Sequence, residues 1–225
     1  MNRLRELSSQ VMDVYQELSV EFGSYQRSQG LGCIEKCGAC CNKPDIEVSP
    51  LEMLPYALHL FDSGQAEQVY NELEAYSGFA CKQYQRLSLD GNEGYCGIYE
   101  YRPGICRMFG AAGYKTKQGE ATLSVCKPIK NAVPEKYATA LIAINGAGDA
   151  ASNRSSSDLA SNSALNSMAS RLKPPMIAEG RQRLVQLDYE LGEKLMSINS
   201  ALRYVLEKIL TVSYYASSND DGVAA

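Results

Sequence analysis

Eight cysteines constrain this chain more than any other feature of its sequence, and four of them fall within nine residues. In this group Cys37 and Cys40 form a C-x2-C unit with Gly38 between them, and Cys33 and Cys41 flank the unit. A tight turn with this spacing can direct two thiolates at one metal ion. Adjacent Cys40 and Cys41 are harder to place on one tetrahedral ion, because neighbouring side chains diverge. For one of the two we therefore leave open a second site, a multi-iron cluster or no metal.

The other four cysteines are spread over the middle of the chain, so only the fold can bring them together. Thiolates select zinc, copper(I) or iron-sulfur clusters over magnesium and calcium, and the chain has a single histidine. The predicted metal ligands are Cys33, Cys37, Cys40, Cys41, Cys81, Cys96, Cys106 and Cys126. Eight thiols suit a multinuclear iron-sulfur cluster, which adjacent thiols slightly favour, or two four-cysteine zinc sites. Cys126 also fits a buried cysteine that binds no metal, because no local spacing ties it to the others.

The compartment decides between metal and disulfides. The first 22 residues interleave charged and apolar residues without the features of a signal peptide, and no apolar run approaches the roughly 20 residues of a membrane-spanning helix. We therefore expect a cytoplasmic protein with no membrane association, in which clustered thiols bind metal. The alternative is an exported chain with four disulfides, in which Cys40 and Cys41 would each need a distant partner.

Length argues against a small fold that depends on cysteine cross-links, and net charge argues against a nucleic-acid-binding protein. A chain of 225 residues can bury a substantial core without cysteine staples. Its net charge of −4 offers no basic surface that could neutralise many phosphates. Nucleic acid is therefore not an expected partner.

Hydrophobic periodicity predicts a mainly α protein with an irregular, metal-organised cysteine-rich region and few short strands. Apolar residues at three- and four-residue spacing predict an amphipathic helix over 3–29. Ser49, Pro50 and Glu52 predict the start of a second helix with a capping box. The segment 78–125, rich in Gly, Tyr and Cys, is expected to be irregular apart from short strand-like pieces.

Composition divides the chain into four parts. They are a metal-binding domain with the N-terminal helix (1–144), a Ser/Ala/Asn-rich linker (145–175), a long amphipathic helix (176–216) and a flexible tail (217–225). A near-heptad apolar stripe predicts the long helix. Packing of that helix into the protein's own core is favoured over pairing with a protein partner or a second copy.

A second motif carries a family resemblance. Cys96-Gly-Ile-Tyr-Glu-Tyr-Arg-Pro-Gly-Ile-Cys106-Arg107 follows the first cysteine group. Together they resemble the YkgJ-type cysteine-cluster family, described as a putative zinc- or iron-chelating domain and including flagellin lysine methylases. The resemblance covers about 32–126, although three residues separate Cys33 from Cys37 where the family pattern more often has two.

The resemblance implies a metal-binding protein whose biological role is undetermined. Two other functions stay open: an S-adenosylmethionine-dependent lysine methylase or redox enzyme, and a structural zinc module for protein–protein interaction. No Gly-rich loop after a strand indicates a binding site for S-adenosylmethionine.

Two arginines flank Cys106. Arg102 and Arg107 are candidates for cofactor binding, because a nearby cation lowers a thiol pKa and can donate hydrogen bonds to cluster sulfurs. An ordinary salt bridge, for instance with Glu100, is the alternative. The single histidine, His59, is expected on a helix face rather than at a metal.

Overall fold

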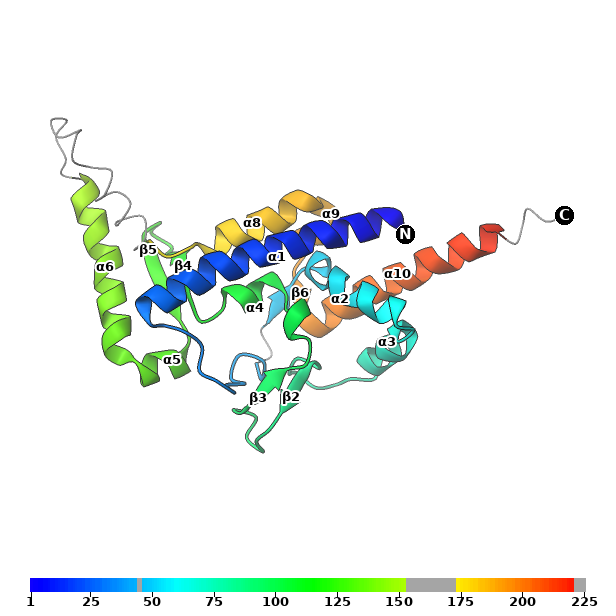
Figure 1. Cartoon of the computed structure of the whole chain (residues 1–225), viewed down its shortest axis with the longest axis horizontal. Coiled ribbons are helices and arrows are strands. Elements are labelled where there is room, and N and C mark those ends of the chain that lie inside the picture. The colour runs from blue at the N-terminus through cyan, green and yellow to red at the C-terminus, as the bar shows by residue number, and fades with distance from the viewer. Residues whose placement is uncertain (44–45, 153–172, 221–225) are drawn as a thin grey trace. The chain divides into compact units, whose positions relative to one another are not determined.

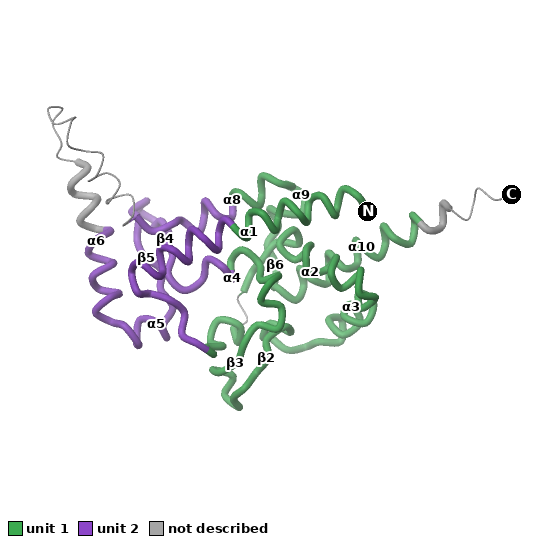
Figure 2. Tube along the Cα trace, in the orientation of Figure 1, with its two compact units in different colours: residues 1–16, 36–105, 182–225 green, residues 17–35, 106–181 purple. Residues whose placement is uncertain are grey.

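The computed structural model describes residues 1–43, 46–152 and 173–220 (Figure 1). The chain forms two compact units (Figure 2). Unit 1 contains residues 1–16, 36–105 and 182–225, and unit 2 contains 17–35 and 106–181. The units are thus built from interleaved segments, rather than from the consecutive segments that composition suggests.

The N-terminal helix is confirmed. Helix α1 spans Asn2–Gln29, so that its first half lies in unit 1 and its second half in unit 2. Its apolar stripe is buried at Leu4, Leu7, Val11, Tyr15, Leu18 and Phe22. Gly30, with a φ of 62°, follows the helix in the left-handed conformation that glycine adopts without strain.

Unit 1 has a helical core formed by α2 (Pro50–Asp62), α3 (Ala66–Glu74) and α10 (Ile198–Asp220), which pack on one another. The capping box of α2 is confirmed, since Glu52 Oε2 accepts from Ser49 N at 2.8 Å. The apolar residues that bind these helices together are Leu51, Leu54, Leu58, Leu202, Val205 and Ile209, all buried.

The prediction of one long helix over 176–216 is wrong, because three helices and a strand occupy this region. Helix α8 (Ile177–Leu187) is followed by α9 (Tyr189–Gly192), β6 (Met196–Ser197) and α10. Asp188 is extended and caps α9 by accepting from Leu191 N at 3.0 Å, and β6 pairs antiparallel with β1 (Glu47–Val48). Periodicity did not reveal these breaks, because the buried apolar positions continue across them.

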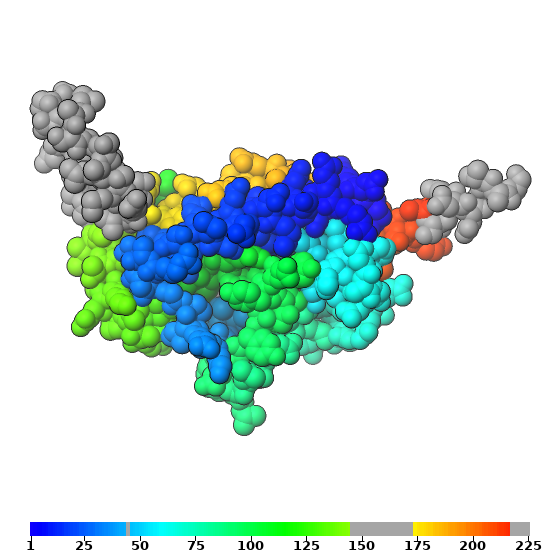
Figure 3. Space-filling view, in the orientation of Figure 1, coloured from blue at the N-terminus to red at the C-terminus, as the bar shows by residue number. Residues whose placement is uncertain are grey.

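The middle of the chain is more regular than its composition suggests. In unit 1, β2 (Tyr84–Arg86) and β3 (Gly94–Cys96) form an antiparallel hairpin that projects in Figure 3, followed by the 3-10 helix η1 (Tyr99–Tyr101). Helix α4 (Gly104–Met108) comes next. The fold class is nevertheless confirmed: the described residues are mainly helical with a few two-stranded sheets.

Unit 2 contains a second hairpin, β4 (Ala111–Lys115) with β5 (Ala121–Val125), and then α5 (Lys127–Ala132) and α6 (Pro134–Ser152). Its core consists of Tyr25, Leu31, Ala111, Leu123, Val125, Ile129 and Ala140. The backbone of 145–152, which composition places in a linker, continues α6. Of the predicted linker, 153–172 lies outside the described residues, as does 221–225 of the predicted tail.

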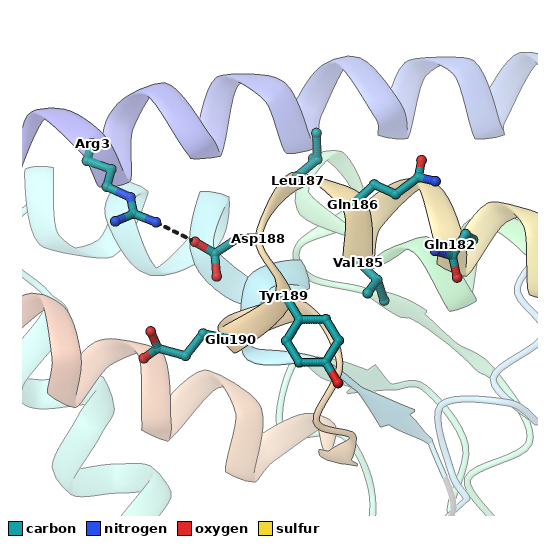
Figure 4. Close-up of a pocket in the computed structure, with 8 residues that line it drawn as sticks. All are labelled: Arg3, Gln182, Val185, Gln186, Leu187, Asp188, Tyr189 and Glu190. Atoms are coloured by element: carbon teal, nitrogen blue, oxygen red, sulfur yellow. Dashed lines mark hydrogen bonds and ion pairs between the residues drawn. The ribbon is translucent and has the colours of Figure 1, made fainter.

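A pocket of about 500 Å³ opens on unit 1 (Figure 4). Its lining comprises Arg3, Gln182, Val185, Gln186, Leu187, Asp188, Tyr189 and Glu190. Arg3 Nη2 lies 3.0 Å from Asp188 Oδ2, and no cysteine lines the pocket. Across the described part of the chain, no helix has the length and apolar character needed to cross a membrane.

Candidate metal centre

Unit 1 holds five of the eight cysteines, and backbone hydrogen bonds attach the segment around Cys37 to the β2–β3 hairpin. Gly94 N donates to Lys36 O at 2.9 Å, and Gly38 N donates to Asn92 O at 2.8 Å. Between them Cys37 forms an isolated bridge with Glu93. The loop of residues 36–42, called the cysteine loop below, therefore lies against the hairpin through one isolated bridge and two backbone hydrogen bonds.

Gly38 is required by this contact. A Cβ atom at position 38 would lie 1.7 Å from the Tyr84 hydroxyl, and that hydroxyl donates to Gly91 O at 2.9 Å. The glycine in the C-x2-C unit thus allows the loop to approach the hairpin closely.

Cys81 joins the loop through its backbone. Its N–H donates to Cys41 O at 3.1 Å. Asn199 of α10 holds the residues on either side, since it accepts from Lys82 N and donates to Ala80 O, both at 2.9 Å. Segments far apart in sequence therefore meet beside the Cys40–Cys41 pair.

Cys96 is the last residue of β3, the second strand of the hairpin. It pairs with Tyr84 across the β2–β3 register, and Gly97 N donates to Gln83 O at 2.8 Å. Cys81 and Cys96 thus lie near the open end of the hairpin, opposite its turn.

The thiols in unit 1 act on one another electrostatically. A hydrogen bond with Cys41, aided by the positive charge of Arg102, lowers the pKa of Cys40 to about 6 against the opposing effect of burial. Burial raises the pKa of Cys81 to about 11, and the charges of Cys96 and Cys40 act in the same direction. Cys81 therefore lies within electrostatic range of both Cys40 and Cys96.

The adjacent cysteines do not diverge as the sequence suggests. Their sulfur atoms lie 3.9 Å apart, in a turn closed by Asn42 N donating to Gly38 O at 3.1 Å. Two thiolates on a tetrahedral zinc ion with Zn–S bonds of about 2.3 Å are about 3.8 Å apart. The pair thus already has the spacing of two ligands of one ion.

Unit 2 holds the other three cysteines. Cys33 is exposed, Cys106 lies on α4 and is half-buried, and Cys126 occupies the N-cap position of α5 and packs against the apolar core. The packing of Cys126 agrees with its alternative interpretation as a core residue. Their roles as ligands stay predictions.

The candidate residues around the thiols have defined contacts. Arg102 is extended before Pro103, and its guanidinium lies 4.6 Å from the centre of the Tyr99 ring. In unit 2, Arg107 Nη1 donates to Ser19 Oγ at 2.9 Å. His59 is exposed on α2, as expected of a helix-face residue, and stacks on Tyr101 at 5.0 Å between ring centres.

Three residues near the thiols are not among the candidates predicted from the sequence. Tyr84 contacts the cysteine loop, Asn199 fixes the Cys81 segment, and Tyr56 is close enough to Cys81 and Cys96 for their charges to raise its pKa, although burial is the larger cause. Only Tyr84 had a signal in the sequence, which was the abundance of tyrosine in the middle of the chain.

The thiols are close but not gathered around one point. Within the described residues, no three side chains from His, Cys, Asp or Glu are arranged as a metal site. The donor set itself fits zinc or iron, because the neighbouring groups are soft sulfur ligands.

Comparison with known proteins agrees with the donor set. Residues 32–127 match a family described as CxxCxxCC, putative zinc- or iron-chelating domain. This confirms the resemblance over that segment, which includes all eight cysteines. No curated protein and no solved structure matches the chain.

Proposed function

We propose that unit 1 binds a single zinc or iron ion through four thiolates, those of Cys40, Cys41, Cys81 and Cys96. The ligands come from the cysteine loop and from the base of the β2–β3 hairpin. Such a site would join segments that have little other regular structure, in the way that structural metal ions stabilise small domains.

The observation that carries this proposal is the 3.9 Å separation of the Cys40 and Cys41 sulfurs. A [4Fe–4S] cluster takes one cysteine on each iron, so two sulfurs at the spacing of one tetrahedral edge favour a shared ion. A [2Fe–2S] cluster, in which two cysteines share each iron, is the form of iron-sulfur site that agrees with this spacing.

The lowered pKa of Cys40 supports the same role. With a pKa of about 6, Cys40 is already a thiolate near neutral pH, and the thiolate is the form that binds metal. Arg102 then offsets part of the negative charge that four thiolates place around a divalent ion.

This assignment leaves Cys33, Cys106 and Cys126 outside the metal site. Cys37, which is attached to the hairpin beside the pair, is the alternative ligand within unit 1. Methyl transfer, a protein partner and a cytoplasmic location stay expectations from the sequence and the family resemblance.

The test is metal analysis of protein purified without oxygen, combined with acid-labile sulfide and the visible spectrum. We expect about one zinc or iron per chain, and Cys40→Ser should lose most of it. Cys126→Ser, a change at a core position of unit 2, is the matched control and should keep the full amount.

Three outcomes would change or overturn this assignment. Iron together with acid-labile sulfide would mean that the site holds an iron-sulfur cluster rather than a single ion. A full metal complement in Cys40→Ser would remove the pair from the site, and wild-type protein without metal would contradict the proposal.

A further inference from the structure

Asn199, the second residue of α10, directs its side-chain amide at the segment that carries Cys81. Its Oδ1 accepts from Lys82 N and its Nδ2 donates to Ala80 O, both at 2.9 Å. A backbone N–H can only donate and a backbone C=O can only accept, so these two partners fix which way the amide points. The partners lie 117 and 119 residues away in the chain, so the contact depends on the tertiary fold.

The two hydrogen bonds belong to the two peptide groups that flank Cys81. The peptide before it consists of Ala80 C=O and Cys81 N–H, and the peptide after it consists of Cys81 C=O and Lys82 N–H. The other half of each peptide is also bonded, since Cys81 N donates to Cys41 O at 3.1 Å and Cys81 O accepts from Tyr84 N at 3.0 Å. All four polar atoms of these peptides thus have a partner, and the amide from α10 supplies two of the four.

Hydrogen bonds on both peptide planes restrict the two soft dihedral angles of Cys81, because these angles describe the rotation of the planes about its Cα atom. The direction of its side chain follows from them. The backbone on either side of Asn199 is itself held. Ile198 N donates to Ile46 O at 3.0 Å, and Ala201 is buried in the core. The amide therefore acts on Cys81 from a fixed position.

We propose that Asn199 is a positioning residue of the metal centre, which fixes the backbone of Cys81 before metal binds and thereby couples the start of α10 to metal binding. This inference rests on the proposed function, in which the Cys81 thiolate is one of four ligands. It gives a helix without cysteines a defined part in metal affinity.

The physical reason is conformational entropy. A ligand residue that moves freely in the metal-free protein loses backbone entropy when metal binds, and this loss weakens binding. A residue that is already ordered avoids most of the loss, as in other preorganised binding sites. Asn199 therefore strengthens metal binding without touching the metal.

The first experiment measures the Zn²⁺ affinity of metal-free, reduced protein by competition with a chromogenic chelator. Asn199→Ala removes both hydrogen bonds. We expect about tenfold weaker Zn²⁺ binding, the lower end of what changes outside the ligand shell cost. Hydrogen exchange of the Lys82 amide should accelerate in the same variant. Unchanged Zn²⁺ affinity would overturn the proposal.

Ser197→Ala is the matched control at the same end of α10. Ser197 Oγ accepts from Ser200 N at 3.2 Å and donates to Ser200 Oγ at 2.8 Å, and neither bond involves the Cys81 segment. We expect a lower melting temperature with a change in Zn²⁺ affinity below about twofold. Equal losses of affinity in the two variants would show that Asn199 acts only through the stability of α10, and would overturn the proposal.

A double-mutant cycle with Cys81→Ser separates positioning from general stability. This background is measured at higher Zn²⁺ concentration, because three thiolates bind the ion more weakly than four. If Asn199 acts through Cys81, Asn199→Ala should cost no further affinity once Cys81 is replaced. Independent losses that multiply would contradict the proposal.

An Asn199→Ala variant that does not fold leaves two routes. Asn199→Leu fills a similar volume without hydrogen bonds and should weaken Zn²⁺ binding only while Cys81 is present. In metal-free wild-type protein the Lys82 amide should be protected from exchange, and free exchange would overturn the proposal without any variant. Failure of the proposed function is distinguishable, because wild-type protein itself would then bind no Zn²⁺.

Discussion

The cysteines of the two units have different surroundings although they belong to one sequence motif. In unit 1, Cys40 contacts Cys41, and the charges of Cys40 and Cys96 act on Cys81; Cys40 and Cys81 have strongly shifted pKa values. In unit 2, one cysteine is exposed, one lies on a short helix and one packs on an apolar core. Residue type is the same in both units, so neighbours and burial determine what each thiol can do.

The largest expected difference between the units is in bound metal. Cys81→Ser and Cys96→Ser should each lose most of the metal, because three thiolates hold an ion far less tightly than four. Cys33→Ser and Cys106→Ser should lose little. Metal content per chain, measured by elemental analysis, checks this, and a large loss in Cys106→Ser would mean that the metal centre extends beyond unit 1.

In metal-free, reduced protein, the free energy of unfolding should decrease at alkaline pH because of a thiol in unit 1. Burial raises the pKa of Cys81 from 9.0 to about 11, so the folded protein keeps this proton when the unfolded chain has lost it. The contribution to stability is therefore complete below pH 9 and is lost as pH rises to about 11. The shift corresponds to about 2 to 3 kcal/mol.

Urea unfolding at pH 8.5 and pH 10.5 measures this loss. Cys81→Ala should show a smaller decrease in unfolding free energy between the two pH values, whatever its absolute stability. An equal decrease in the variant would assign the alkaline effect to other groups.

Each unit has a buried tyrosine whose hydroxyl can be removed by substitution with phenylalanine. We expect the change in unfolding free energy to have opposite signs in the two units. Within the described part of the chain, Tyr25 Oη of unit 2 is buried without a hydrogen-bond partner, and burial raises its pKa to about 12. Tyr25→Phe should therefore stabilise the protein by about 1 kcal/mol at neutral pH.

Tyr15 of unit 1 is the matched control. Its hydroxyl donates to Glu52 O at 2.5 Å, so Tyr15→Phe should cost about 1 kcal/mol. Thermal unfolding of both variants checks the pair of signs. Destabilisation by Tyr25→Phe would show that its hydroxyl has a partner, such as a buried water.

The smallest expected effects concern backbone conformation. Three residues separate Cys33 from Cys37, and the last of them, Lys36, has a left-handed φ of 58°. Lys36→Gly should relieve strain and stabilise the protein by less than about 1 kcal/mol, since glycine also loses more entropy on folding.

The opposite change in unit 2 is its control. Gly119 has a φ of 87°, and a Cβ atom there would meet nothing within 4 Å. Gly119→Ala should thus cost about 1 kcal/mol through the backbone alone. Chemical denaturation distinguishes the two changes, and a loss of stability in Lys36→Gly would mean that the lysine side chain contributes more than the strain costs.

Local signals in the sequence were sufficient for several elements. The buried stripe of α1 and the capping box at Ser49 and Glu52 depend on residues within a few positions of each other, and both are as predicted. The C-terminal region differs, because the cap at Asp188 and the pairing of Met196 with Val48 interrupt a stripe whose apolar spacing continues. Spacing reports which residues are buried, but not whether the helix between them is continuous.

The sequence by itself determined the soft sulfur chemistry of the candidate site, the mainly α fold class and the family to which residues 32–127 are similar. Those properties depend on residue type and short spacing. Only the tertiary structure brought Cys81 to the Cys40–Cys41 pair and Cys96 within electrostatic range of Cys81, and connected Glu52 to Ile105. The hydrogen bonds from Cys81 to Cys41 and from Ile105 to Glu52 join residues 40 and 53 positions apart. They form because burial of the α2–α3–α10 core and pairing of the β2–β3 hairpin lower the free energy of the folded chain.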